Sequence, residues 1–129
     1  MIDAIGNDRI ASMLVSFLDV QSQRAQVASS NIANADTPGY TAKGLEFADY
    51  LRQTAFDAVA PNARPALLKL GADQPALVEL GGQSGIDGNT VDMAHEMSQL
   101  GDAGMKYLAG VTLLQSRLRL LSTAIKEGK

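Results

Sequence analysis

The side chains best suited to metal chemistry are His95 and Glu96, because they begin the zinc-protease pattern H-E-x-x-H. The second metal ligand of that pattern would stand at position 99, which is Gln99. His95 is the single histidine among 129 residues, whereas a zinc site needs about three protein ligands. We therefore expect no metal here and interpret His95 as a polar residue on a helix.

Other candidate chemistry is weaker still. Gly82, Gly85 and Gly88 precede a predicted helix, where backbone N–H groups could bind a phosphate. Neither G-x-G-x-x-G nor a Walker-type Gly-Lys-Ser/Thr sequence occurs, so turns and linkers are the expected use of these glycines. The absence of Cys excludes disulfides, thiol catalysis and Cys-based metal sites. We predict that the protein is not an enzyme and uses no cofactor.

Composition favours a packing role over a ligand pocket. Apolar residues make up 46% of the chain, enough for a core or a large interface, but aromatic residues make up only 5%. Ligand pockets and nucleic-acid platforms usually contain more aromatic surface. The formal net charge of −3 lacks the basic footprint of a nucleic-acid-binding protein. We therefore expect no nucleic-acid partner.

The chain begins Met1-Ile2-Asp3-Ala4-Ile5, without the basic region and apolar stretch of a secretory signal. No stretch reaches the roughly 18 apolar residues that a membrane span requires. We expect no direct membrane insertion and, if the protein leaves the cytosol, a route without a cleaved signal peptide.

The first zone predicts a helix from about Asn7 to Asn34, because its apolar residues follow helical spacing. Gln21 and Arg24 lie on or near that apolar stripe. The helix should stop near Asn34, since Pro38 disfavours helical geometry in the residue before it. Pro38 and Gly39 suit the central positions of a type II turn.

The middle zone, residues 41–88, is rich in Pro and Gly. Leu45 to Ala60 could form a short helix. Two brief apolar runs, Ala66 to Leu70 and Ala76 to Leu80, could be the strands of a hairpin or simply extended chain.

The last zone predicts a long helix from Thr90 to Ile125, about 50 Å in length. Asp87 and Gly88 signal a turn, and Asn89 is the candidate N-cap, with Asp92 completing a weak capping box. An apolar seam with alternating steps of four and three residues follows, and nine of its ten positions are apolar. The seam consists of Met93, Met97, Leu100, Gly104, Tyr107, Val111, Leu114, Leu118, Leu121 and Ile125.

A lone helix with such a stripe is not stable in water, so the stripe must be buried. The N-terminal helix is the obvious partner, in an antiparallel or crossed pair. Two helices make a thin core, and a monomer cannot leave so much apolar surface exposed, so the terminal helices should also pack against other subunits. Gly101, Gly104 and Gly110 within the helix suggest close approach of a neighbouring backbone, with a flexible break as the alternative.

We therefore predict a mainly α fold in which long N- and C-terminal helices pair as a coiled coil. A small irregular middle region would hold a short helix and a β-hairpin. The expected divisions are residues 1–40, 41–88 and 89–129, with the two terminal helices forming one domain.

The run from Ser29 to Tyr40 resembles the N-terminal signature of flagellar rod and hook proteins. That signature is an Asn-(Ile/Leu)-Ala-Asn core followed by Thr-Pro-Gly-Tyr or a near variant. Asn31 and Asn34 can bond backbone groups where the helix ends, and Asn34 tolerates the left-handed cap position. The matching residues are Asn31, Ile32, Ala33, Asn34, Thr37, Pro38, Gly39 and Tyr40.

Three further runs extend the resemblance over nearly the whole chain: Leu45 to Leu51, Asp87 to Met93, and Lys106-Tyr107 with the Leu-rich tail ending at Lys126. Together they are similar to the flagellar basal-body rod protein family of the proximal-rod FlgB type. Gly101 and Gly104 depart from the expected pattern, because better helix formers would be usual there.

The resemblance implies a structural subunit without catalytic activity, exported through the flagellar type III apparatus without a cleaved signal. Such subunits self-associate helically into the periplasmic rod that transmits torque. The implied partners are other rod proteins, the adaptor FliE, and components of the MS ring and export gate.

Two other classes of function stay open. A cytosolic helical adaptor or export chaperone would explain the apolar seam but not the signature run. A small enzyme with an unrecognised site has no supporting motif.

Overall fold

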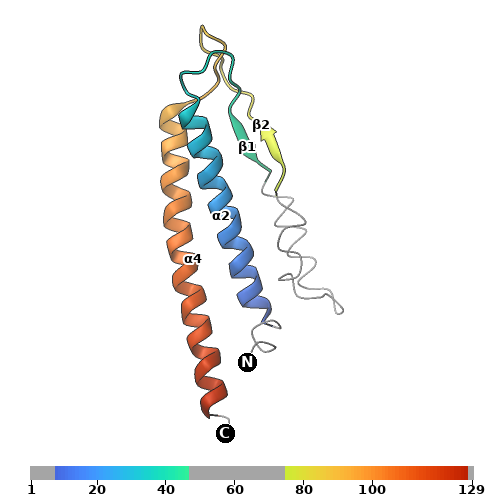
Figure 1. Ribbon diagram of the computed structural model, residues 1–129, viewed down its shortest axis with the longest axis vertical. Helices are drawn as coiled ribbons and strands as arrows, with labels where there is room; N and C mark the ends of the chain where they lie inside the picture. The colour runs from blue at the N-terminus through green and yellow to red at the C-terminus, as the bar shows by residue number, and fades with distance from the viewer. Residues whose placement is uncertain (1–7, 47–74, 128–129) are drawn as a thin grey trace.

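The computed structural model describes residues 8–46 and 75–127, which form two long antiparallel helices and a small sheet (Figure 1). The helix α2 spans Arg9–Ala33 and the helix α4 spans Met93–Glu127. The strands β1 (Lys43–Leu45) and β2 (Leu77–Glu79) lie on the side of α2 opposite α4 (Figure 1). The predicted mainly helical fold with paired terminal helices is confirmed.

The helix α2 begins and ends on polar side chains. Asp8 is its N-cap, and the Asp8 carboxylate accepts hydrogen bonds from the backbone N–H groups of Ile10 and Ala11. At the other end, Asn34 has φ −105°, so the expectation that it adopts the left-handed cap position is wrong. Its backbone N–H instead donates to the carbonyl groups of Ser30 and Asn31, which tightens the last turn.

The turn after α2 has the predicted form. The backbone N–H of Tyr40 donates to the carbonyl of Thr37 at 3.2 Å, which closes a four-residue turn. Gly39 has φ +70°, the positive value that the third position of a type II turn requires. The turn reverses the chain so that β1 runs back alongside α2.

The two strands pair antiparallel, with Lys43 opposite Glu79 and Leu45 opposite Leu77. The strand β2 lies inside the predicted run Ala76–Leu80, but its partner β1 was not predicted. Leu45, expected to begin a short helix, ends β1 instead. The rest of that expected helix and the run 66–70 lie outside the described residues.

The residue that caps the start of α4 differs from the one expected. Asp92 caps the helix, because its side-chain Oδ1 accepts from the backbone N–H of His95 at 3.1 Å. The prediction that Asn89 is the N-cap is wrong, and α4 begins at Met93, three residues later than Thr90. The turn predicted at Asp87-Gly88 is present, since the N–H of Gly88 donates to the carbonyl of Gly85 and Gly88 has φ +78°.

The contact between α2 and α4 is made largely by small residues. A Cβ added at Gly110 would lie 2.8 Å from Leu18 Cδ2 and 3.1 Å from Phe17 Cδ1, so α2 packs closely against this glycine. Among the described residues, the buried apolar side chains are Ala11, Val20, Ala28, Ala42 and Ala103. Four of these five side chains are alanine and bury little apolar area each, whereas the larger Phe17 and Leu18 of the pair are only half-buried.

A buried polar residue weakens the same region further. Gln21, which interrupts the apolar stripe of α2, is almost fully buried. Its Oε1 has no hydrogen-bond partner in the described structure. An unpaired buried acceptor costs free energy that a purely apolar interface would not lose.

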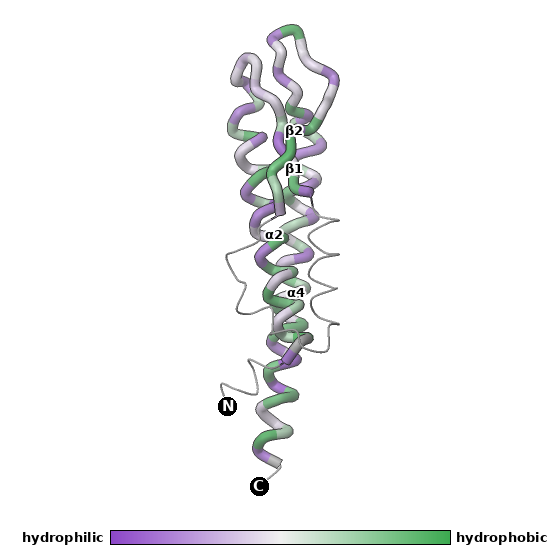
Figure 2. Tube along the Cα trace, turned by 90° about the vertical axis from the view of Figure 1, so that its right-hand side faces the viewer, coloured by the Kyte–Doolittle hydropathy of each residue, from purple (hydrophilic) through white to green (hydrophobic). Residues whose placement is uncertain are grey.

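An ion pair fixes the register of the two helices at their other end. Arg117 Nε donates to Asp8 Oδ2 at 2.7 Å, and an Arg117 terminal nitrogen lies 3.3 Å from Asp8 Oδ1. Asp8 therefore caps α2 and binds α4 with one carboxylate. The last ten residues of α4, 118–127, continue beyond this point (Figure 2). In the described part of the chain, neither helix is apolar enough over its length to cross a bilayer.

The substitution Asp8→Asn should lower the melting temperature at neutral pH, because Asn can still cap α2 but cannot pair with Arg117. The hydrogen bond from Arg117 holds the pKa of Asp8 below its usual value of 3.8, and the helix N–H groups act in the same direction against the effect of burial. The pair therefore stabilises the fold above about that value, and its contribution is lost as the pH falls through the lowered pKa.

Melting curves of both proteins, recorded by circular dichroism from neutral pH into acid, provide the measurement. The difference between them should be largest at neutral pH and should shrink below the usual Asp range. A difference that stays constant into strong acid would contradict a role for the Asp8 charge.

Candidate assembly site

The side chain of the signature residue Asn31 bonds the backbone of β1 in the way that a residue of a neighbouring strand would. It is 0% exposed. Its side-chain Nδ2 donates to the carbonyl of Lys43 at 2.8 Å, and its Oδ1 accepts from the backbone N–H of Lys43 at 3.0 Å. The hydroxyl of Tyr40 donates to the same Oδ1 at 3.2 Å. One carboxamide thus joins α2, the turn and β1, and both its nitrogen and its oxygen have hydrogen-bond partners although the residue is fully buried.

Asn89 holds the end of α2 from the other half of the chain. Its side-chain Nδ2 lies 2.8–2.9 Å from the carbonyl oxygens of Asn34, Ala35 and Thr37. Its Oδ1 accepts from the backbone N–H of Val91 at 2.7 Å. These carbonyls follow the last residue of α2, so this buried side chain ties the turn after the helix to the segment that precedes α4.

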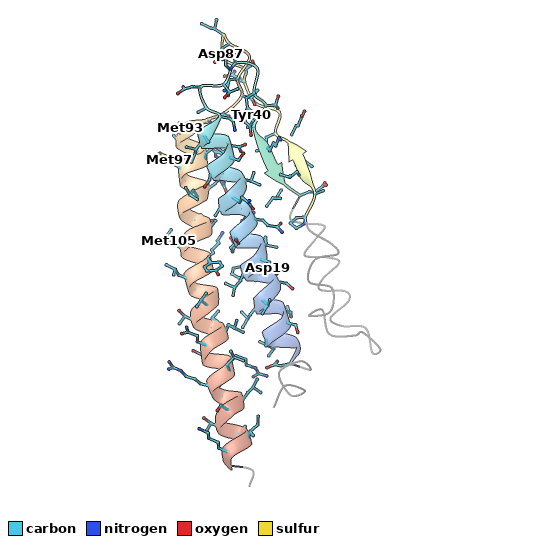
Figure 3. The ribbon with its side chains drawn as sticks, in the orientation of Figure 1. Asp19, Tyr40, Asp87, Met93, Met97 and Met105 are labelled. Carbon is cyan, nitrogen blue, oxygen red and sulfur yellow. The ribbon has the colours of Figure 1, made fainter. Side chains whose placement is uncertain are left out.

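Backbone bonds complete the junction between the two segments. The N–H of Gly39 donates to the carbonyl of Asp87 at 2.9 Å, and the N–H of Thr90 donates to the carbonyl of Tyr40 at 3.1 Å. Figure 3 shows Tyr40 and Asp87 at the same end of the helix pair. Two of the runs that carry the resemblance, 29–40 and 87–93, therefore form one structural unit, which we call the signature junction.

The remaining signature residues are more accessible. Ala33, Thr37, Pro38 and Gly39 are exposed, and Ile32 and Asn34 are half-buried. The Nδ2 of Asn34 donates to the carbonyl of Ser30, four residues earlier, at the protein surface. The Asn residues do bond backbone groups as expected, but Asn31 does so across the fold rather than at the end of its own helix.

The predicted seam of α4 is divided between two environments. Leu100, Val111, Leu114 and Leu121 are half-buried. The other six seam positions are more than a third exposed: Met93, Met97, Gly104, Tyr107, Leu118 and Ile125.

A neighbouring row on α4, formed by Glu96, Ala103, Gly110 and Arg117, is the more deeply buried one. Gly110 packs against Phe17 and Leu18, and Arg117 binds Asp8. The sequence analysis missed this row because the seam was predicted from the spacing of large apolar side chains, and this row contains none. The available signal was the spacing of seven residues between the small residues Ala103 and Gly110.

In the described part of the chain, the outward side of α4 carries large apolar side chains that are mostly exposed. Leu108 is 68% exposed although leucine normally favours burial. A Cβ added at Gly101 or Gly104 would meet no atom within 4 Å, so these glycines are not required by any contact within the described chain. We call this the open face of α4, and its large members are Met97, Met105, Leu108, Leu113 and Leu120.

The region suggested by the zinc-protease pattern contains no assembled site. His95 is exposed, and its backbone N–H is used in capping α4. Across residues 8–46 and 75–127, no three His, Asp or Glu side chains come together as metal ligands would.

An uncovered helix face joined to a rigid junction defines an assembly subunit, in which helical packing and not a pocket is the functional surface. Comparison with known proteins agrees. The model of the family "Flagella basal body rod protein" matches residues 15–41. The flagellar basal body rod protein FlgB of Salmonella typhimurium is 33% identical over 122 residues, covering 86% of this chain and 88% of that protein.

FlgB of Aeromonas hydrophila is 34% identical over 131 residues, covering 95% of this chain and 97% of that protein. FlgB of Escherichia coli K12 is 33% identical over 122 residues. The chain belongs to the FlgB family of flagellar basal body rod proteins.

The isosteric substitution Asn31→Asp should destabilise the fold by about 2 kcal/mol or more, because a carboxylate cannot donate to the carbonyl of Lys43 in this buried position. The same change at the exposed Asn34 loses only a surface hydrogen bond and should cost well under about 1 kcal/mol. Urea unfolding followed by circular dichroism compares the two variants. Equal destabilisation would show that the buried carboxamide does not organise the junction.

Proposed function

We propose that this protein is a structural subunit of the flagellar basal-body rod and that it polymerises through α2 and α4 to transmit torque across the periplasm. The observation that carries the proposal is the open face of α4, which a solitary subunit would leave in water. Membership of the FlgB family supplies the assembly in which such a face would be covered.

The geometry suits a part that carries torsional load. Close-packed apolar helix faces resist shear because their interdigitated side chains have little free volume. The signature junction ties the end of α2 to the segment before α4 through the side chains of Asn31 and Asn89. Torque applied to one helix would therefore pass to the other through buried hydrogen bonds and not through a flexible loop.

Gly101 and Gly104 fit the same proposal. Each costs about 1 kcal/mol in a helix relative to Ala, and neither glycine is in contact with the described part of its own chain. We propose that a helix of a neighbouring subunit approaches α4 closely at these two positions. The exposed signature residues Thr37, Pro38 and Gly39 would also be available for contacts between subunits.

The proposed partners are other rod proteins, the adaptor FliE and components of the MS ring and export gate, at the base of the periplasmic rod. Export without a cleaved signal peptide and the lack of a catalytic role belong to the same proposal. Its support is the resemblance of the signature and tail runs. The alternative of a cytosolic adaptor or export chaperone is not favoured, because it leaves the family match unexplained.

Leu108→Glu should prevent rod assembly without unfolding the subunit. The side chain is largely exposed in the monomer, so the change should alter the free energy of unfolding by less than about 0.5 kcal/mol. In an interface between subunits, however, it would bury an unpaired charge. Leu108→Met keeps the apolar contact and is the matched control.

The measurement is electron microscopy of basal bodies from a strain that lacks the gene and carries each variant. The empty strain should make MS rings without rods, and the unmutated chain and Leu108→Met should restore rods. Normal rods in the empty strain would refute the proposed function. Normal rods with Leu108→Glu would show that this face is not an interface.

A further inference from the structure

The signature junction contains the one Asp-Gly step of the sequence, Asp87-Gly88, and the sequence has no Asn-Gly step. An Asp-Gly step is chemically reactive, because the side-chain carboxyl lies within reach of the next backbone nitrogen and glycine has no side chain to hinder the approach. The nitrogen of Gly88 can attack Cγ of Asp87. The new N–Cγ bond closes a cyclic imide, while the amide proton and the carboxyl hydroxyl leave together as water.

Water reopens this imide at either of its carbonyl carbons. Attack at Cγ restores aspartate, whereas attack at the former backbone carbon gives isoaspartate, in which the main chain runs through Cβ and Cγ. The main chain then contains one more atom between Cα of residue 87 and the nitrogen of Gly88, and the former backbone carbonyl becomes a free carboxylate. Water is the sole co-reactant.

In the folded protein, both reacting groups are engaged with other partners. The N–H of Gly88 donates to the carbonyl of Gly85 at 3.0 Å. The Asp87 Oδ1 accepts from the backbone N–H of Asn89 at 3.1 Å, and the Asp87 carbonyl accepts from the N–H of Gly39 at 2.9 Å. Ring closure has to break these hydrogen bonds, because the nitrogen of Gly88 must turn away from Gly85 and toward Cγ of Asp87.

Burial does not protect this step from water. Asp87 is exposed and lies at the loop end of the helix pair (Figure 3). Its protection therefore depends on the geometry of the closed junction. In the folded protein, the reaction must wait for local opening, which is governed by the free energy of opening that region. An unfolded chain has none of these hydrogen bonds.

We propose that Asp87-Gly88 is a site of isoaspartate formation in the unfolded chain and that closure of the signature junction suppresses the reaction. The product cannot rebuild the junction, because the added main-chain atom displaces Asn89. The Nδ2 of Asn89 lies 2.8–2.9 Å from the carbonyl oxygens of Asn34, Ala35 and Thr37, and a network of this kind does not tolerate the loss of one member.

The consequence for assembly rests on the proposed rod function. Chains that remain unfolded before export are open to the reaction, and the longer they wait the more of them carry isoaspartate at residue 87. Modified copies lack a closed junction and are left out of rods. The chemistry of the step itself does not depend on the rod function.

The chemical part is tested by incubating the purified full chain at neutral pH with and without enough urea to unfold it. Enzymatic methylation of the free carboxylate with a labelled methyl donor counts isoaspartate, and resistance to Asp-N protease locates it. It should accumulate at residue 87 in urea and at least about tenfold more slowly in the folded protein. Equal rates, or no isoaspartate at residue 87 in urea, would overturn the inference.

Two variants show whether the junction is the cause. Asn89→Ala should raise the rate in the folded protein toward the rate in urea, whereas Asn34→Ala, which loses only exposed side-chain bonds, should not. Full protection in an Asn89→Ala protein that keeps its helix content by circular dichroism would overturn the role of the junction. If Asn89→Ala unfolds, the unmutated chain with and without urea still decides. Asp87→Glu should remove the signal, because its side chain must close a larger ring.

A comparison within cells tests the consequence for assembly. Subunits recovered from purified basal bodies should carry isoaspartate at residue 87 less often than the unassembled subunits of the same cells, measured by the same protease assay. Equal fractions in the two pools would overturn the exclusion of modified copies from rods. Failure of the unmutated chain to restore rods in the null strain would instead refute the proposed function and leave the chemistry of Asp87-Gly88 standing.

Discussion

The helix α4 has a described neighbour within its own chain along one side only, the side where Gly110 meets Phe17 and Leu18. That contact is close but small, since alanine and glycine supply most of its fully buried apolar positions. Hydrophobic stabilisation grows with the apolar area removed from water. The pair therefore gains little in isolation, and the large apolar residues Leu108, Leu113 and Leu120 would stabilise the fold only where another subunit covers them. In the proposed rod, this division of small and large residues would couple folding to assembly.

The asparagine carboxamides have a different role: they hold the loop end of a thin helix pair in one defined geometry. Asn31 and Asn89 both satisfy backbone groups of segments distant in sequence. A buried polar network of this kind is strict, because removal of one partner leaves the others unsatisfied. It fixes where α2 stops and where the segment leading to α4 begins, so neighbouring subunits would meet a constant angle between rigid parts. At pH values above the lowered pKa of Asp8, the Asp8–Arg117 pair does the same at the opposite end.

Local sequence rules predicted the elements well, because helical periodicity and the Pro38-Gly39 turn act over a few residues. They failed where a residue acts over a long distance. Asn89 has the residue type and position of a helix N-cap, but its partners are carbonyls more than fifty residues earlier. The β1 strand escaped prediction because its pairing with β2 and Asn31 is tertiary. The seam was traced through large side chains, whereas the buried row uses small ones, and no local rule distinguishes a face that meets α2 from one that meets a neighbour.

Methionine oxidation tests most directly whether the open face is covered by neighbours. Met97 and Met105 are 62% and 69% exposed in the subunit, and exposed methionine is readily oxidised to the sulfoxide. Limited peroxide treatment followed by mass spectrometry would compare the purified subunit with intact basal bodies. The account predicts rapid oxidation of both residues in the free subunit and strong protection of both in rods. Equal oxidation rates in the two preparations would contradict it.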